Sequence, residues 1–184
     1  MKKMNVLIVL ITAVLVTACS SSSSSDSGST TGQNVTFKFN GTNVTAAVTS
    51  AKLYKSQGTN EKLLEIIAES DDKEFEFKFF SGYTADDAIP PGDYISSDTS
   101  SEGYAYVSFK INGNKYGLHS PENGVMHITT CLSSTKKATG TFTQTLYAIG
   151  ETQDFDYLGV TIPYEINITN GIFTNLQYEV VLLN

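Results

Sequence analysis

The chain has no arginine and no tryptophan, and lysine alone supplies its positive charge. Its formal net charge is −7, whereas nucleic-acid binders cluster Lys and Arg on one face. We therefore expect no nucleic-acid partner, and equally no basic patch for an anionic membrane surface. The missing arginine also argues against phosphate-handling enzymes, which commonly hold phosphate in arginine forks. The missing tryptophan removes the usual platform on which a sugar stacks.

Cysteine is scarce too, since only Cys19 and Cys131 occur. With Cys19 assigned below to lipid attachment, Cys131 has no partner, which excludes an intrachain disulfide even in a compartment that would permit one. Long apolar runs are missing as well, with one exception between Val6 and Leu15. The chain beyond that run is long enough for one domain with a hydrophobic core.

The N-terminal run has the layout of a secretory signal peptide. Lys2 and Lys3 precede it, and it is shorter than the roughly 20 residues that a permanent transmembrane helix needs. Val16-Thr17-Ala18-Cys19 resembles the lipobox of bacterial lipoproteins. The resemblance implies that residues 1–18 are removed and that Cys19 is acylated, so the membrane is a partner through the lipid anchor. A plain signal peptide that is cut elsewhere is the alternative.

The position after the cysteine bears on localisation. Ser20 resembles the sorting pattern of outer-membrane lipoproteins, which places the protein in the cell envelope. Surface-exported lipoproteins tend to carry an acidic cluster after the cysteine, and here Asp26 stands alone. The periplasmic and the surface face therefore both stay open. The following Ser-rich residues have nothing apolar to bury, so residues 19–34 are predicted to be the lipidated cysteine and a flexible tether.

From residue 35 the sequence consists of short runs in which apolar and polar residues alternate, rich in Val, Ile, Phe, Tyr and Thr. This pattern predicts a single all-β domain over residues 35–184. About ten short strands with frequent turn signals indicate an antiparallel β-sandwich or a barrel-like fold. Lys62 to Glu69 fits a helix face as well as a strand, and a strand is favoured by the turn that follows it. The predicted strands are 35–39, 44–48 with an extension to 54, 62–69, 74–80, 103–112, 115–118, 124–132, 139–149, 157–169 and 172–183.

Three Asn-Gly pairs, Asn40-Gly41, Asn112-Gly113 and Asn170-Gly171, are predicted to be tight hairpin turns. The third turn would join the last two strands into a hairpin that closes the core and buries the C-terminal residues. The stretch from Ser81 to Ser101 contains Pro90, Pro91 and several aspartates, and it is expected to be irregular.

Four short motifs resemble a family of small Bacteroidota outer-membrane lipoproteins. They are Phe37 to Gly41, Ile89 to Tyr94, Gly140 to Phe142 and the closing Ile168 to Phe173. The likeness covers essentially the whole mature domain. Since this family has no assigned activity, the resemblance implies an all-β lipoprotein and transfers no catalytic residue.

The histidines and the free cysteine give no catalytic or metal-binding pattern. His127 and Cys131 lie four residues apart, which on one face of a strand separates them by about 13 Å, too far for one metal ion. We interpret them as an ordinary strand histidine and a structural thiol. His119 is expected in a turn, and no Gly-x-Ser-x-Gly nucleophile motif occurs.

Acidic and aromatic residues are the remaining site candidates. Asp86, Asp87 and Asp93 in the irregular stretch could form a weak acidic-loop site. A structural calcium ion is the only cofactor they suggest, although no EF-hand spacing supports it and a solvated acidic loop is the alternative. The tyrosines that could line a sugar-binding face are Tyr83, Tyr94, Tyr104, Tyr106 and Tyr116.

These patterns favour a membrane-anchored envelope lipoprotein whose non-catalytic β-domain binds a partner protein, a glycan or another envelope component. The alternatives are an envelope hydrolase that uses carboxylate or histidine chemistry, and a structural or assembly subunit of a surface complex. A hydrolase would show a pocket with converging titratable groups. A binder would expose an aromatic patch or groove, and an assembly subunit a long unpaired edge strand.

Overall fold

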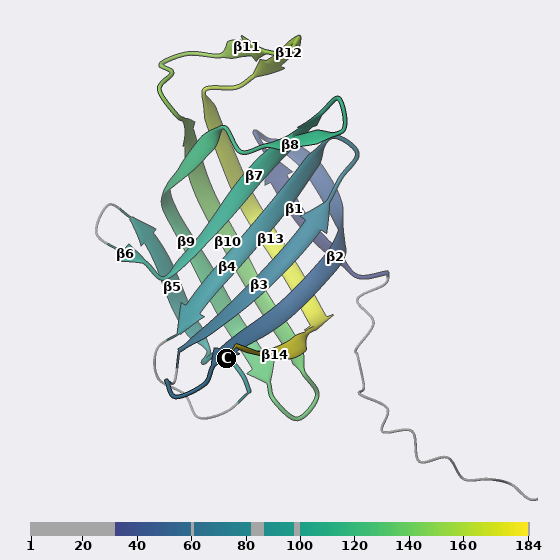
Figure 1. Ribbon diagram of the computed structural model, residues 1–184, viewed down its shortest axis with the longest axis vertical. Coiled ribbons are helices and arrows are strands. Elements are labelled where there is room, and N and C mark those ends of the chain that lie inside the picture. The colour runs from purple at the N-terminus through teal and green to yellow at the C-terminus, as the bar shows by residue number, and fades with distance from the viewer. Residues whose placement is uncertain (1–31, 60, 82–86, 98–99, 184) are drawn as a thin grey trace, which may run out of the picture.

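The computed structural model describes residues 32–59, 61–81, 87–97 and 100–183, and the regular structure in these ranges is entirely β (Figure 1). The all-β prediction is therefore confirmed. Over the same ranges no helix has the length and apolar character needed to cross a membrane. The strands are β1 (Asn34–Phe39), β2 (Thr42–Ser56), β3 (Lys62–Glu69), β4 (Lys73–Ser81), β5 (Gly92–Ser97), β6 (Ser100–Ser101), β7 (Gly103–Ile111), β8 (Asn114–Tyr116), β9 (His119–Leu132), β10 (Lys137–Ala148), β11 (Phe155–Tyr157), β12 (Val160–Ile162), β13 (Glu165–Gln177) and β14 (Glu179–Leu183).

Most strands belong to one large sheet, ordered β6-β5-β9-β10-β13-β1-β2-β3-β4-β7-β8, with β14 added beside β2. The pairings are antiparallel except that of β14, which runs parallel to β2. In the described part of the chain β6 and β8 end this order without pairing with each other, so the sheet is open and not a closed barrel. Strands β11 and β12 form a separate small sheet at the top of Figure 1.

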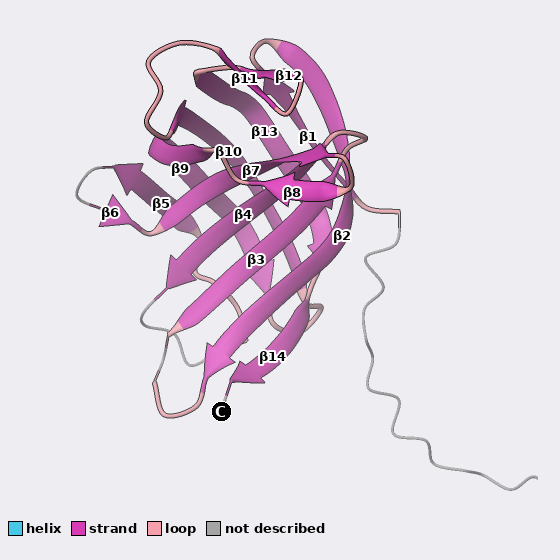
Figure 2. Ribbon diagram, turned by 45° about the horizontal axis from the view of Figure 1, so that its top comes forward, coloured by secondary structure: helices cyan, strands magenta, loops and turns pink. Residues whose placement is uncertain are grey.

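The large sheet folds over, so that its two halves face each other as the layers of a sandwich (Figures 1 and 2). Aromatic side chains join the layers. The rings of Phe77 on β4 and Phe142 on β10 have centroids 4.4 Å apart, and those of Phe79 on β4 and Phe173 on β13 are 5.7 Å apart. Each fully buried side chain of this size stabilises the fold by about 1.5–3 kcal/mol.

Alternation predicts strands β3, β4 and β7 well. Lys62–Glu69 is a strand, as favoured, and the inward-facing phenylalanines of β4 are all fully buried. Asn40-Gly41 and Asn112-Gly113 both have positive φ at the two central residues and connect β1 to β2 and β7 to β8. These two hairpin turns are confirmed.

The predicted turn at Asn170-Gly171 is wrong. Strand β13 continues through both residues and pairs with β10 on one side and with β1 on the other. Only Asn170 has a positive φ, 53°, and the register shifts at this point in both ladders. The pair is therefore a β-bulge, which one asparagine in the left-handed region is sufficient to make.

The predicted C-terminal hairpin is wrong with it. The expected strand 157–169 is divided between the β11–β12 hairpin and the start of β13. The terminal strand β14 is paired, as expected, but it lies parallel to β2, with Val181 opposite Tyr54. Leu182 and Leu183 are exposed, which contradicts the expected burial of the chain end.

A second bulge changes the faces of β9. The register against β10 shifts between the Thr139–Thr130 and Gly140–Ile128 pairs, so one extra residue stands between Ile128 and Cys131. Cys131 therefore points inward with Ile128, while Leu132 is exposed. His127 is half-buried and pairs with Asp93, away from the core, so the prediction that His127 and Cys131 share a face is wrong.

Four other parts of the chain differ from the sequence-based description or fall outside the structure. His119 begins β9 and is buried, although a turn was expected there. The irregular stretch 81–101 contains β5, which pairs with β9. Gln33, ahead of the predicted domain start, accepts from the Val48 N–H through its backbone carbonyl and from the Gln177 N–H through its side-chain oxygen. The predicted signal peptide, Cys19 and most of the tether lie outside the described residues.

Candidate ligand groove

The three aspartates of the predicted acidic-loop site do not share a partner. Asp86 lies outside the described residues, Asp87 is 2.8 Å from the Lys55 ammonium, and the Asp93 carboxylate is 2.6 Å from Nδ1 of His127. Across the described ranges no three His, Cys, Asp or Glu side chains gather in a way that would hold a metal ion.

Cys131 lies in a hydrogen-bonded cluster inside the fold. Its Sγ accepts from the backbone N–H of Ile89 at 3.3 Å and lies 3.5 Å from the Tyr178 hydroxyl. That hydroxyl donates to the backbone carbonyl of Asp87 at 2.7 Å. Burial, followed by the neighbouring thiol, raises the pKa of Tyr178. These contacts hold the segment before β5 against β9 and the end of β13, which is a structural role.

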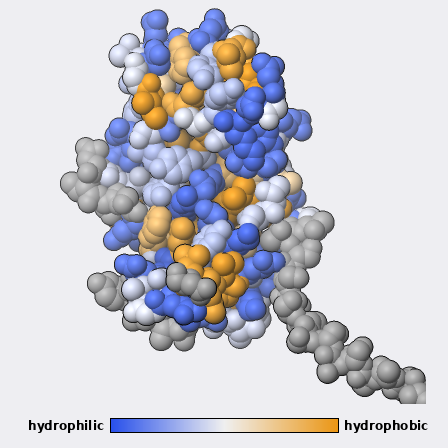
Figure 3. Space-filling view, viewed as in Figure 1, coloured by the Kyte–Doolittle hydropathy of each residue, from blue (hydrophilic) through white to orange (hydrophobic). Residues whose placement is uncertain are grey.

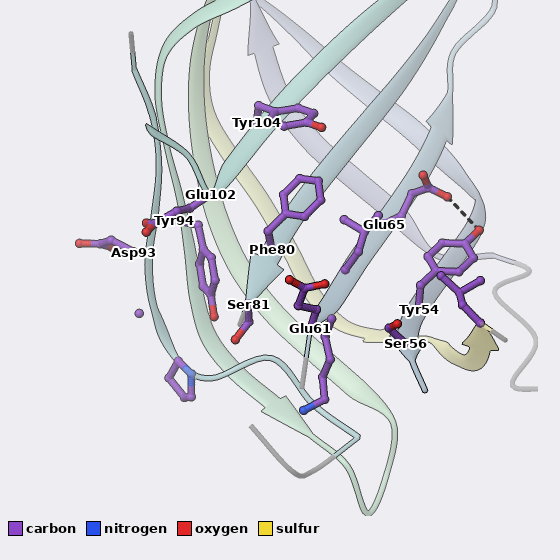
Figure 4. Close-up of a pocket in the computed structure, with 15 residues that line it drawn as sticks. Tyr54, Ser56, Glu61, Glu65, Phe80, Ser81, Asp93, Tyr94, Glu102 and Tyr104 are labelled. Carbon is purple, nitrogen blue, oxygen red and sulfur yellow. Dashed lines mark hydrogen bonds between the residues drawn. The ribbon is translucent and has the colours of Figure 1, made fainter. Parts of the chain in front are cut away.

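The described part of the chain contains a groove of about 1120 Å³. It lies where the ends of β2 and β4 meet the starts of β3, β5 and β7, away from the β11–β12 hairpin (Figures 1 and 4). Figure 3 shows hydrophobic and hydrophilic surface side by side on the lower part of this face. The lining includes the aromatic residues Tyr54, Phe80, Tyr94 and Tyr104 and the acidic residues Glu61, Glu65, Asp93 and Glu102.

Strand register explains why these side chains meet. Tyr54 on β2 is opposite Leu63 on β3, which is opposite Phe80 on β4, so the three form one row across the sheet. The next row joins Glu65 on β3 to Lys78 on β4 and Tyr104 on β7. Because alternate residues of a strand face the same side, both rows lie on the outer face, opposite the buried phenylalanines.

The rings on this face touch one another in sequence. The centroids of Phe80 and Tyr104 are 5.6 Å apart, and those of Tyr104 and Tyr106 are 4.9 Å apart with nearly perpendicular planes. We call Phe80, Tyr104 and Tyr106 the aromatic row. Phe80 is 37 % exposed, while burial, followed by the neighbouring Tyr106, raises the pKa of Tyr104. The row is thus packed at one end and open at the Phe80 end.

One wall of the groove is fixed by an ionic network. The Tyr54 hydroxyl donates to Glu65 at 3.1 Å, and the Lys78 ammonium lies 3.6 Å from Glu65 and 3.0 Å from Glu76. Burial raises the pKa of Glu76. For Lys78 burial acts against the charge, but the hydrogen bond and charge of Glu76 outweigh it and raise the pKa. The lysine therefore stays protonated between the two carboxylates.

The two other glutamates of the groove are differently placed. Glu61 precedes β3 and Glu102 precedes β7, and both are exposed. Within the described ranges neither carboxylate has a hydrogen-bond or ion-pair partner, whereas Glu65 and Asp93 are engaged by neighbouring side chains. Burial, followed by Cys131 and then by the charge of Glu102, raises the pKa of Tyr94 to about 12. Tyr94 is therefore a neutral hydrogen-bonding group in this wall.

Neither histidine lines the groove. His127 is paired with Asp93, and His119 is buried, with Nε2 2.6 Å from the Pro163 carbonyl. Burial lowers the pKa of His119, so its ring is neutral at pH 7. The described groove residues therefore offer carboxylates, phenols and rings, which can bind hydroxyl groups, amines and apolar faces.

The sequence identified part of this site. Tyr94 and Tyr104 line the groove, and Tyr106 extends the aromatic row. Tyr83 lies outside the described residues, and Tyr116 packs against Tyr157 elsewhere, with ring centroids 5.2 Å apart. Phe80 and Tyr54 were missed. The available signal was the Phe79-Phe80 pair, because two consecutive aromatic residues on a strand must place one ring on the outer face.

Comparison with protein-family models, with curated proteins and with solved structures finds no match to this chain. The resemblance of its motifs to Bacteroidota lipoproteins therefore stays a prediction.

Proposed function

We propose that this chain is an envelope lipoprotein, held in the outer membrane through Cys19, whose β-domain binds a glycan in the groove without cleaving it. The observation that carries the proposal is the aromatic row, which reaches the groove at its exposed end, Phe80. Apolar rings on the outer face of a sheet are otherwise costly to leave in water, and a concave site with a few polar groups is the usual form of a ligand site.

The lining chemistry suits a saccharide. A sugar ring has apolar C–H faces, which can lie on Phe80 and the neighbouring Tyr104, and hydroxyl groups around its rim. Those hydroxyls can donate to the carboxylates of Glu61 and Glu102, which have no partners among the described residues. The Tyr94 hydroxyl lies in the same wall and donates to the Pro90 carbonyl at 2.6 Å, so towards a ligand it can only accept.

The anchor supports binding as the main role. Several acyl chains on one cysteine hold a protein stably, so the domain would stay at the membrane and retain whatever it binds. The Ser-rich tether would let the groove reach a ligand at some distance from the bilayer.

A glycoside hydrolase is the second candidate, because Glu61 and Glu102 line one groove and such enzymes work with two carboxyl groups. The two candidates differ in a simple readout. A binder returns the saccharide intact, whereas a hydrolase releases shorter products on prolonged incubation.

The test uses the full chain in detergent micelles, screened on a glycan array and then measured by calorimetry. We expect binding of at least one saccharide class, and Phe80→Ala should weaken it about 2- to 10-fold, since an aromatic contact contributes roughly 0.5–1.5 kcal/mol. Ile95→Ala is the matched control, because Ile95 is a similarly exposed apolar residue outside the groove. Equal effects of the two variants, or no saccharide bound, would contradict the proposal.

A further inference from the structure

We propose that the groove selects saccharides that carry protonated amino groups, and that Glu61 and Glu102 hold the ammonium. This inference rests on the proposed function, because it concerns the same groove. It adds the chemical class of the ligand, an amino sugar.

The charge of the groove favours a cationic ligand. Four acidic residues line it, and Lys62 is the only basic one among the described lining residues. Lys62 is 3 % exposed and shares the inward-facing set of β3 positions with Leu64 and Ile66, and the acidic side chains outnumber it in the groove. An anionic saccharide would therefore meet like charges, which an interface disfavours.

Two of the four carboxylates are available to a ligand. Glu65 accepts from Tyr54 and pairs with Lys78, and Asp93 pairs with His127. Glu61 and Glu102 have no such partner in the described part of the chain. A ligand that neutralises them forms charge-assisted hydrogen bonds, which are roughly twice as strong as neutral ones.

The backbone places both glutamates beside the open end of the aromatic row. The N–H of Phe80 donates to the carbonyl of Glu102 at 2.7 Å, so Glu102 stands directly opposite Phe80 across β4 and β7. Glu61 is next to Lys62, which is opposite Ser81 on the other side of β4. Figure 4 shows the Glu61 carboxylate below the Phe80 ring, with Glu102 beside Tyr94.

A sugar that stacks on Phe80 thus has one carboxylate on each side of β4. An ammonium on that sugar is attracted by both glutamates and also by the faces of Phe80 and Tyr104, since a cation over an aromatic ring is stabilised when partly desolvated. A neutral N-acetyl group in the same position would keep the stacking and lose the charge.

The experiment compares three tetrasaccharides by calorimetry on the full chain in detergent of zero net charge. They are the glucosamine tetramer, its N-acetylated form and a galacturonic acid tetramer. The pH is about 6.5, so that amino groups are protonated, since it lies below the pKa of about 7.7–8.0 that is typical of an α-amino group. We expect the glucosamine tetramer to bind about 10-fold more tightly than the acetylated one, as one charge-assisted hydrogen bond would give. The galacturonic acid tetramer should show no binding.

Three variants locate the effect. Glu61→Gln and Glu102→Gln keep the shape of the side chain, and each should weaken binding of the glucosamine tetramer about 10-fold while leaving the acetylated tetramer unchanged. Glu151→Gln, an exposed glutamate outside the groove, should change neither. On the unaltered chain, added salt should weaken only the glucosamine tetramer, which tests the charge without any substitution.

The outcomes separate this inference from the proposed function. If the acetylated tetramer binds as tightly as the glucosamine tetramer and both glutamate variants bind normally, the amino-sugar inference is wrong and glycan binding stands. If trilysine peptide binds as tightly as the glucosamine tetramer and Phe80→Ala affects neither, the groove recognises cations alone, and both proposals fail. If the unaltered chain binds none of the three tetramers, both the amino-sugar inference and the proposed function are wrong.

Discussion

Replacing Gly171 by alanine should destabilise the domain through one steric contact. A Cβ atom on Gly171 would lie 2.4 Å from two ring carbons of Phe142. Phe142 is 2 % exposed, and its ring centroid lies 4.4 Å from that of Phe77 on β4 and 5.9 Å from that of Phe37 on β1. The ring therefore has no space to retreat into.

The size of the effect follows from the cost of inserting a methyl group into a packed core, about 1–3 kcal/mol. Total stability is only about 5–15 kcal/mol, so the loss is large enough to measure. For a domain of this size each kcal/mol lowers the melting temperature by roughly 2–4 °C. Urea unfolding and thermal melting followed by circular dichroism should show both changes.

Two comparisons make the reasoning refutable. Gly117→Ala should be neutral, because the nearest atom to its Cβ would be the Ser108 hydroxyl at 3.8 Å. Phe142→Leu removes the ring edge, so the Gly171→Ala/Phe142→Leu pair should lose about 0.5–3 kcal/mol less than the sum of the two single variants. Strict additivity of the two free-energy changes would mean that the added methyl group does not press on Phe142. The cost would then be one of backbone conformation, as in the hairpin turn that the sequence suggested.

Three further predictions follow from individual residues. Burial lowers the pKa of His119 from 6.5, and its Nδ1 has no partner among the described residues. The unfolded state therefore binds the proton more readily, and the free energy of unfolding should fall as the pH drops through about 6.5. His119→Gln should flatten that pH dependence in urea melts between about pH 5 and 7.5, and an unchanged slope would contradict the prediction. Tyr178→Phe should cost about 1–3 kcal/mol in the same assay, because it leaves the part-buried Asp87 carbonyl without its donor; a neutral result would show that another donor replaces the phenol. Cys19→Ala should abolish acylation and release the protein from the membrane fraction, measured by mass spectrometry and fractionation, and normal processing would refute the lipobox assignment.

The sequence predicts the strands best where alternation is uninterrupted. Glu74 to Phe80 and Gly103 to Ile111 each place every second residue inside, and the structure buries those residues without exception. Two Asn-Gly pairs are followed at once by a returning strand with the same alternation, and both are turns. In these segments local conformation and core packing require the same structure, so pattern alone is enough.

Prediction fails where one extra residue is inserted into a strand. In β13 the buried positions move from Ile166 and Ile168 to Gly171 and Phe173, and then to Leu176. Each shift coincides with an asparagine of positive φ, Asn170 and Asn175. Locally Asn170-Gly171 has the same preference as the two true turns. It becomes a bulge because β10 and β1 pair with the two edges of the strand, so residues distant in sequence determine its conformation.

The groove depends on long-range geometry of the same kind. Its rows combine side chains of β2, β3, β4 and β7, and no local pattern shows that Tyr54, Phe80 and Glu102 will meet. Close packing between β5 and β7 holds Glu102 and Phe80 in this arrangement. There a Cβ on Gly103 would lie 2.7 Å from the Tyr94 Cβ, and the buried Gln144 accepts from the Ala105 N–H at 3.2 Å. The close approach lets Glu102 donate its N–H to the Ile95 carbonyl at 3.0 Å while its own carbonyl accepts from Phe80. One glycine and one inward-facing glutamine on the core side thus hold the glutamate and the ring in place on the outer side.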